Sequence, residues 1–350
     1  MAPIILGLQQ ASWARVRVVA TAQHRQLLDK VLSFFDIEPN IDLDAMRPDQ
    51  ALPDLTAKLL TELDRCFAQE APDAVLAQGD TTTVMVSALA AFYRKIPFGH
   101  VEAGLRSGDV LSPFPEEMNR ILASNLARWH FAPTESARTN LLAEAIPADS
   151  IFVTGNTVID ALLDVSSRCD ADTPDLPSDK RLILVTAHRR ENFGKPFAQI
   201  CRAIRYLADL REDVIFLYPV HPNPHVKDAA YCILGGHPRI RLCEPLDYVP
   251  FVAAMKRASF ILSDSGGVQE EAPALGKPVL VLRRETERPE AVAEGVVRLV
   301  GPDFDAIVRE SQRLLDDPRA YGSMARGVSP YGDGHSAGRI VAVLGRSVAE

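Results

Sequence analysis

The chain has 350 residues, of which 47% are hydrophobic and 24% charged, and its formal net charge at pH 7 is −8. This length accommodates two domains, and the composition is that of an ordinary globular protein rather than a disordered or fibrous one. The acidic balance argues against a nucleic-acid partner and against an acidic membrane surface, since both usually require a basic face.

Nothing in the sequence suggests export or membrane insertion. The five cysteines are odd in number and form no CxxC pair, which fits reduced thiols better than a disulfide framework. No apolar run approaches the ~20 residues of a membrane span, and no basic region precedes the first apolar residues. We therefore expect a cytoplasmic protein that does not associate with membranes.

The first half of the chain alternates between short apolar runs typical of buried strands and longer segments typical of helices. The expected helices are 3–13, 23–35, 52–69, 81–93, 116–127, 135–144 and 158–167, and the expected strands are 16–20, 74–77, 97–101, 129–132 and 151–154. The chain thus opens on a helix, whereas a nucleotide-binding domain of this type normally opens on a buried strand.

A linker is expected at 169–180, where prolines and aspartates interrupt the apolar pattern. The alternation then resumes, with strands at 182–186, 214–219, 240–242, 260–263 and 279–282 and helices at 197–208, 225–234, 248–256 and 268–275. This pattern predicts an α/β protein with two Rossmann-like parallel-sheet domains and a ligand-binding cleft between them. We place the first domain at 1–168 and the second at 181–335, with a helix at 336–350 that packs back on the first domain.

The segment 100–120, HVEAGLRSGDVLSPFPEEMNR, places four carboxylates and two arginines in one connection between an expected strand and an expected helix. Ligands of α/β proteins bind beyond the carboxyl ends of the strands, so this segment is a candidate binding site. A solvated acidic loop is the alternative. Asp80 follows another strand end, and its carboxylate is a candidate either for capping the next helix or for proton transfer.

In the second domain, the segment 262–271, LSDSGGVQEE, turns from a strand directly into a helix. Ser265, Gly266 and Gly267 allow a phosphate to approach the helix start, and Glu270 or Glu271 lies where a carboxylate can accept bonds from ribose hydroxyls. A tight strand-to-helix turn without a ligand is the alternative interpretation.

Cations gather at other strand ends of this domain. His188, Arg189 and Arg190 follow one strand, and a further set, Arg283, Arg284 and Arg288, follows another and could close the same anion site. His221 and His225 are four residues apart, but the prolines around them break the helix that metal binding at that spacing requires, so no metal site is expected. Neither GxSxG nor a P-loop occurs, so neither triad hydrolysis nor P-loop phosphotransfer has support.

The ordered motifs resemble those of the non-hydrolysing UDP-N-acetylglucosamine 2-epimerases over essentially residues 1–345. They are QGDTTT, HVEAGLRSGD, PFPEEMNR, TGNTVID, VTAHRREN, PVHPNP, SDSGGVQEEAPALGKPVLVLR and TERPEA. The resemblance implies the fold of the GT-B glycosyltransferases, a homodimer, and interconversion of UDP-GlcNAc and UDP-ManNAc with neither cofactor nor metal. UDP is eliminated across C1–C2 to give 2-acetamidoglucal and is then added back, and the product feeds cell-surface polysaccharide synthesis.

The resemblance also assigns roles to individual residues. The acid–base candidates are Asp80, Glu102 and Glu116, with Arg120 and His188 in the same active site. The UDP-binding candidates are Ser265, Gly266 and Gly267 for phosphate, Glu271 for ribose, Arg288 for the nucleotide and Phe251 for the uracil environment. A second, activating UDP-GlcNAc is expected to contact Gln23, Gln26, Arg189 and His221.

One departure from the family lies at the start of the chain. Members begin with a strand that ends in a GTRPE-type loop, whose arginine reaches the diphosphate, whereas MAPIILGLQQ matches the helix that follows this loop. Either the start codon is placed too late or the strand has been lost. We expect the 350-residue chain to be a weak or inactive epimerase, and comparison with a product begun upstream would test this.

Three other functions remain open on the sequence. The first is a UDP-sugar glycosyltransferase of the same fold, which needs an acceptor pocket rather than acids around C2 of the sugar. The second is a hydrolytic epimerase that releases free ManNAc and UDP, and the third is a UDP-sugar binder with little activity.

Overall fold

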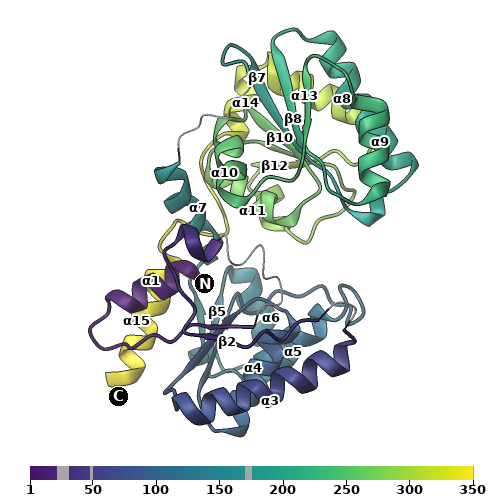
Figure 1. Ribbon diagram of the computed structural model, residues 1–350. Helices are drawn as coiled ribbons and strands as arrows, with labels where there is room; N and C mark the ends of the chain where they lie inside the picture. The colour runs from purple at the N-terminus through teal and green to yellow at the C-terminus, as the bar shows by residue number, and fades with distance from the viewer. Residues whose placement is uncertain (22–30, 48–49, 170–175, 350) are drawn as a thin grey trace. The chain divides into compact units, whose positions relative to one another are not determined.

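The computed structural model describes residues 1–21, 31–47, 50–169 and 176–349 (Figure 1). The chain divides into two compact units, of which unit 1 is Met1–Ala161 with Gly334–Glu350 and unit 2 is Leu162–Asp333. The division falls within helix α7 (Thr157–Arg168), earlier than the linker expected at 169–180. Both units contain parallel sheets with connecting helices, so the predicted two-domain α/β class is confirmed.

Unit 1 contains a four-stranded parallel sheet in the order β3-β4-β5-β6 and a separate two-stranded parallel sheet. The four strands are β3 (Val75–Gln78), β4 (Phe98–Val101), β5 (Trp129–Ala132) and β6 (Ile151–Val153), and the pair is β1 (Val19–Ala20) and β2 (Ile41–Asp42). All residues of β4 and β5 are buried, which is why these strands appear in the sequence as short continuous apolar runs.

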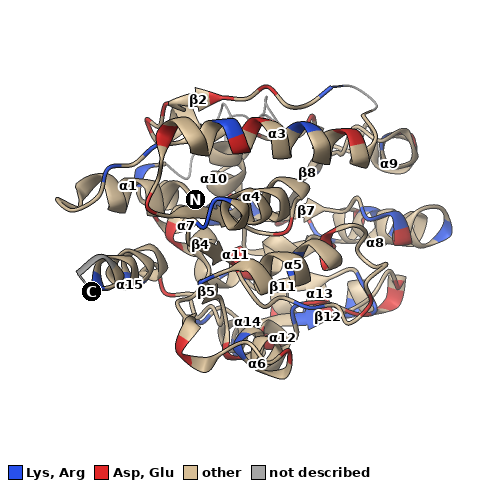
Figure 2. Ribbon diagram, turned by 90° about the horizontal axis from the view of Figure 1, so that it is seen from below, with Lys and Arg blue, Asp and Glu red and all other residues tan. Residues whose placement is uncertain are grey.

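The helices of unit 1 form because an apolar stripe of each can be buried against the sheets. They are α1 (Ala2–Gln10), α3 (Leu52–Glu70), α4 (Thr82–Tyr93), α5 (Glu116–Leu126), α6 (Glu135–Ala143), the short 3-10 helix η1 (Ala148–Ser150) and α15 (Ser336–Ala349). In α3 the buried residues include Leu55, Leu59 and Leu63, one turn apart. Charged residues of both signs lie elsewhere along that helix (Figure 2).

The helix at the end of the chain belongs to unit 1. Ile340 and Leu344 of α15 share a buried cluster with Ile4 of α1 and with Trp129 of β5. The Trp129 indole also donates a hydrogen bond to the Ser347 hydroxyl, at 3.2 Å.

Unit 2 is built on a six-stranded parallel sheet in the order β12-β11-β10-β7-β8-β9. Its strands are β7 (Arg181–Thr186), β8 (Val214–Pro219), β9 (Ile240–Cys243), β10 (Phe260–Ser263), β11 (Val279–Val281) and β12 (Val297–Leu299). The chain runs outward from β7 to β9 and then returns to β10 on the other side of β7. Such a reversal of strand order is the point at which open α/β sheets bind their ligands.

The helices of unit 2 bury one face against this sheet, as in the amphipathic α8, whose Ile200, Ile204 and Leu207 are all inaccessible to solvent. The helices are η2 (Arg190–Asn192), α8 (Lys195–Leu210), α9 (Pro224–Leu234), α10 (Tyr248–Arg257), α11 (Gly266–Ala274), α12 (Pro289–Ala293), α13 (Phe304–Asp316) and α14 (Pro318–Met324). None of the helices in the described part of the chain is long and apolar enough to cross a membrane.

The first strand of the main sheet lies inside the sheet in unit 2 but at an edge of the described sheet in unit 1. In unit 2 the first strand, β7, pairs with both β8 and β10. In the described part of unit 1 no strand joins β1 to β3, and β3 is half-exposed along its whole length.

Some element boundaries differ from those expected. The first helix ends at Gln10 rather than at residue 13, and the first strand is limited to Val19–Ala20. Most of the helix expected at 23–35 lies outside the described residues. The sequence analysis did not predict β2, β12 or the helices α12, α13 and α14. The two residues of β2 are too few to show a period, whereas α13 buries Ile307, Leu314 and Leu315 and had a usable helical pattern.

Candidate functional site

In unit 1, Asp80 and Arg120 form an ion pair at the carboxyl end of the sheet. Asp80 follows β3, and Arg120 lies in the second turn of α5. Arg120 Nε and Nη2 both donate to Asp80 Oδ2, at 2.9 and 2.6 Å, and Asn119 Nδ2 donates to the Asp80 carbonyl at 2.9 Å. The residue at the N-cap of α4 is Thr81, whose side chain makes no capping bond, so Asp80 is held by α5 rather than used as a cap.

Glu102, the residue after β4, has an unusual backbone conformation. Its φ is +66°, a left-handed value that a non-glycine residue adopts at a cost and that is often found at functional sites. Glu102 Oε2 accepts a hydrogen bond from Gln78 Nε2 and Oε1 accepts one from Asn156 Nδ2, both at 3.4 Å. The last residue of β3 and the turn after β6 therefore each direct a side-chain amide at this carboxylate.

A buried histidine fixes the turn that carries Asp80. His100 in β4 is fully buried, and burial lowers the pKa of its imidazole to about 4, so the ring is neutral at pH 7. Its Nε2 lies 2.8 Å from the Gly79 carbonyl oxygen and must carry the proton in order to donate to it. The backbone next to Asp80 is thus held from inside the sheet.

The two adjacent glutamates at the start of α5 have opposite environments. Glu116 is half-exposed, as a group that reacts with a ligand should be. Glu117 is 1% exposed and accepts bonds from the Ser107 and Gly108 amides and from Arg120. The sequence motif drew attention to Glu116 and gave no sign that its neighbour is the residue that is buried and bonded.

In unit 2, the loops after β7 and β10 lie side by side because these strands are neighbours and their ends pair, Thr186 with Ser263. The fully buried Asp264 joins the two loops. Its carboxylate accepts hydrogen bonds from the backbone amides of His188 (3.0 and 3.1 Å) and Arg189 (2.9 Å) and from Asn192 Nδ2 (3.0 Å). Sequence reasoning missed Asp264, although its place between a strand and a Ser-Gly-Gly turn was a usable signal.

The loop that Asp264 holds contributes His188 and Arg189 to a polar cluster, which also contains His221. The rings of His188 and His221 stack with centroids 5.4 Å apart and an angle of 12° between planes. Burial, together with the nearby His221 and Arg189, lowers the pKa of His188 despite the Asp264 charge, so His188 is neutral at pH 7. The Arg189 Nε is buried and has no hydrogen-bond partner among the described residues.

The start of α11 lies next to Arg189. A Cβ placed on Gly266 would be 3.8 Å from Arg189 Nη2, and one placed on Gly267 would be 3.8 Å from Glu271 Oε1 and 3.9 Å from Ser265 Oγ. Free backbone amides at a helix start, together with a guanidinium, suit a phosphate. Phe251, in α10, is partly buried.

Two arginines expected near the anion are engaged in ion pairs within unit 2. Arg288 Nε is bonded to Glu270, so the carboxylate of Glu270 is engaged with this arginine. Arg283 is bonded to Glu191 and to both carboxylate oxygens of Glu287. Arg283 is therefore not placed as the free cation that the sequence suggested.

Glu271 provides a pH-dependent prediction. Burial and then the Glu270 charge raise its pKa to about 8, above the ordinary value of 4.5. The folded protein therefore retains this proton better than the unfolded chain does. The resulting stabilisation is complete below pH ~4.5 and is lost as the pH rises through about 8.

We expect Glu271→Gln to raise the free energy of unfolding at pH 9, relative to the unsubstituted chain, by up to about 3 kcal/mol, and to change it little at pH 4.5. Thermal unfolding at the two pH values measures this. Glu285→Gln, the same change at an exposed glutamate, is the control. The prediction would be contradicted if the free energy of unfolding depended on pH equally in Glu271→Gln and in the unsubstituted chain.

Comparison with known proteins identifies the family of the chain. The sequence pattern of the UDP-N-acetylglucosamine 2-epimerase family matches residues 7–345. The chain belongs to this family. A UDP-N-acetylglucosamine 2-epimerase from Salmonella typhimurium is 51% identical over 354 residues, covering 98% of this chain and 94% of the relative.

Two solved structures of epimerases from this family are similar over nearly the whole chain. The UDP-GlcNAc 2-epimerase from Neisseria meningitidis, bound to UDP-GlcNAc, is 46% identical, with a TM-score of 0.90 over 99% of this chain and 96% of that one. The Methanocaldococcus jannaschii enzyme, in complex with UDP-GlcNAc and UDP, is 34% identical, with a TM-score of 0.80 over 99% and 95%. The family expected from the motifs is thus confirmed.

The structure brings the candidate residues into two groups, one in each unit. Asp80, Glu102, Arg120 and the start of α5 form the first, and His188, Arg189, His221, Ser265 and Glu271 border the second. Gln23 and Gln26 lie outside the described residues. Among the residues that the structure describes, no group of three or more His, Cys, Asp or Glu side chains could hold a metal ion.

Proposed function

We propose that this chain interconverts UDP-GlcNAc and UDP-ManNAc by eliminating UDP and adding it back. The observation that carries the proposal is the acidic group of unit 1, in which Glu102 lies beside the turn that presents Asp80, and Asp80 is paired with Arg120. Family membership and the substrates bound by the Neisseria and Methanocaldococcus relatives support the choice of nucleotide sugar.

The reaction needs carboxylates near C2 of the sugar. One carboxylate removes the C2 proton while the C1–oxygen bond breaks and UDP departs, leaving 2-acetamidoglucal. A carboxylic acid on the other face of the ring then returns a proton to C2 as UDP adds back to C1. Asp80, Glu102 and Glu116 are the candidates, and Arg120 Nε and Nη2 both donate to Oδ2 of Asp80.

The departing UDP needs donors for the charge that develops on its diphosphate. In unit 2 the start of α11 supplies backbone amides, and the neighbouring Arg189 supplies a buried guanidinium nitrogen that bonds to none of the described residues. Ser265, Gly266 and Gly267 are proposed to contact the phosphates, with His188 beside them. Glu271 is proposed for the ribose, Phe251 for the uracil environment and Arg288, held by Glu270, for the nucleotide site.

Activation by a second UDP-GlcNAc remains a proposal for this chain. Arg189 and His221, two of its four expected contacts, border the same cluster as His188. A ligand that contacts them would therefore adjoin the UDP-binding loops. A sigmoidal dependence of the initial rate on UDP-GlcNAc concentration, made hyperbolic by His221→Ala, would support activation.

The decisive experiment is incubation with UDP-GlcNAc alone in D₂O. An epimerase gives UDP-ManNAc and incorporates deuterium at C2 of both nucleotide sugars, which ¹H NMR detects as loss of the C2 proton signal. A glycosyltransferase leaves C2 undeuterated, and a hydrolytic enzyme accumulates free ManNAc and UDP. Binding of UDP without any exchange would identify a binder with no activity and would overturn the proposal.

The cellular setting follows from the same proposal. We place the enzyme in the cytoplasm, where nucleotide sugars are made, and all five cysteines are free thiols, as that compartment favours. We also expect it to be a homodimer that supplies UDP-ManNAc to cell-surface polysaccharide synthesis. Sedimentation of the purified chain would test the dimer.

A further inference from the structure

Glu117 is a buried carboxylate that the reaction described above does not use. It lies in the first turn of α5 and is 1% exposed. Its Oε1 accepts hydrogen bonds from the backbone amides of Ser107 (3.0 Å) and Gly108 (3.1 Å), and its Oε2 accepts one from Arg120 Nη1 (2.8 Å). A buried charge of this kind is costly unless it is fully paired, so its partners indicate what it holds in place.

Arg120 lies between two carboxylates. Its Nη1 is taken by Glu117, while Nε and Nη2 are both directed to Asp80 Oδ2. The guanidinium is a rigid planar fork, so fixing one nitrogen fixes the direction of the other two. The contact with Glu117 therefore determines how Arg120 meets the acid–base candidate Asp80.

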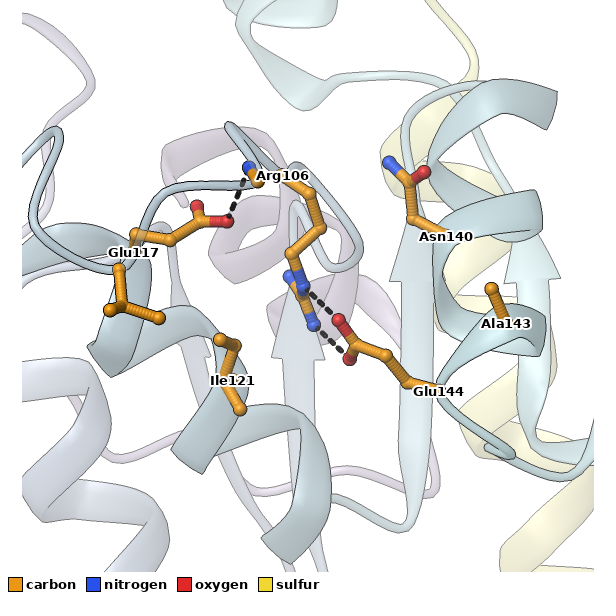
Figure 3. A pocket seen from close by; sticks show the side chains of 8 residues that line it. Arg106, Glu117, Ile121, Asn140, Ala143 and Glu144 are labelled. Atoms are coloured by element: carbon orange, nitrogen blue, oxygen red, sulfur yellow. Dashed lines mark hydrogen bonds and ion pairs between the residues drawn. The ribbon is translucent and has the colours of Figure 1, made fainter.

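The same carboxylate holds the loop between β4 and α5. Figure 3 shows Glu117 reaching the loop from α5, while Arg106 from the same loop turns to Glu144 at the end of α6. These side chains border a cavity of about 250 Å³. The loop is thus anchored to α5 through Glu117 and through the bond from Arg106 to Ser124, and to α6 through Asn140 and to the residue after it through the Arg106–Glu144 pair. Of these contacts, only that of Glu117 leads through Arg120 to Asp80.

We propose that Glu117 is a positioning residue of the epimerase reaction, which holds Arg120 against Asp80 and ties the 107–108 loop to α5. The inference rests on the proposed function. It separates the roles of two adjacent glutamates, since Glu116 is open to a ligand and Glu117 acts through Arg120 without meeting the sugar.

The test is a double-mutant cycle in the complete chain, with C2 deuterium exchange of UDP-GlcNAc as the assay. The glutamine of Glu117→Gln has one oxygen acceptor and no charge. If that oxygen accepts from the loop, the NH₂ group faces Arg120; if the neutral oxygen faces Arg120, the NH₂ group faces the loop amides. We expect Glu117→Gln to lower kcat by about 10- to 100-fold with KM changed less than about threefold, because small misplacements of reacting groups cost this much. In an Arg120→Met background the same change should have little further effect on kcat.

Two further variants keep the result interpretable. Glu144→Gln removes the charge from the Arg106–Glu144 pair, a loop contact that does not involve Arg120, and should leave kcat within about twofold of the unsubstituted chain. Glu117→Asp keeps the charge, should lose less activity than Glu117→Gln, and replaces it in the cycle if the glutamine variant does not fold.

An unchanged kcat in Glu117→Gln would overturn the positioning role. So would an equal fold-loss with and without Arg120, because a residue that only supports the fold has additive effects. If the unsubstituted chain shows no deuterium exchange, the proposed function fails instead, so the two failures are distinguishable.

Discussion

Replacement of Arg120 by methionine is expected to lower kcat for epimerisation by about 10²–10³-fold, the usual loss when one fixed charge is removed from an active site. The side chain is 15% exposed, and three of its nitrogens contact Asp80 and Glu117. Methionine fills a similar volume but leaves both carboxylates without their cation. The charge of Asp80 would then be uncompensated at the position where the C2 proton is proposed to move.

Stability should fall as well, because Glu117 would remain buried without its ion-pair partner. Removing one partner of a buried pair typically costs about 3–5 kcal/mol, so unfolding by urea should be measured alongside activity. Arg120→Lys retains the positive charge but lacks the planar guanidinium. We expect this variant to restore more of the stability than of the kcat that Arg120→Met loses. Arg94→Met removes an exposed arginine that pairs with Asp64 by two bonds and is the matched control, with kcat unchanged.

The result that would contradict this prediction is an Arg120→Met variant that is folded and has a kcat within threefold of the unsubstituted chain. The Asp80–Arg120 pair would then be structural, and the acid–base role would have to be carried by Glu102 and Glu116 alone.

The sequence was informative about polar turns that directly follow buried strands. Strand ends followed by Gln-Gly-Asp, Thr-Gly-Asn and Ser-Gly-Gly could be placed because continuous apolar runs predict buried parallel strands. Since parallel strands carry their carboxyl ends to one edge, the polar turns were expected to meet there, and in unit 1 Asn156 does contact Glu102.

What could not be foreseen is which polar side chains pair with one another. Asp80 and Arg120 are 40 positions apart, and their contact depends on how α5 packs against α4 and β4. Along the chain Glu116 and Glu117 are equivalent, and only the direction of the first turn of α5 buries one and exposes the other. Likewise, Arg283 resembled an anion ligand until its two glutamate partners, Glu191 and Glu287, were seen.

Replacement of Asp264 by asparagine is expected to weaken UDP binding by about 10- to 100-fold. The fully buried carboxylate receives two backbone amides and the Asn192 amide, and it determines where His188 and Arg189 begin their loop. Asparagine has the same shape, but its NH₂ group would face one of these donors. Each buried donor left without an acceptor costs about 1–3 kcal/mol, which the loop can avoid only by moving.

Isothermal titration with UDP and thermal unfolding of the free protein together identify the cause. If the loop moves, Kd for UDP rises and the melting temperature falls, because the same hydrogen bonds serve both binding and stability. Asp209→Asn, a change at a mostly exposed aspartate that contacts His237 in the same unit, should leave Kd unchanged. A Kd for Asp264→Asn within twofold of the unsubstituted chain would mean that UDP is held without the loop that carries His188 and Arg189, and the proposed phosphate contacts would then have to come from the start of α11 alone.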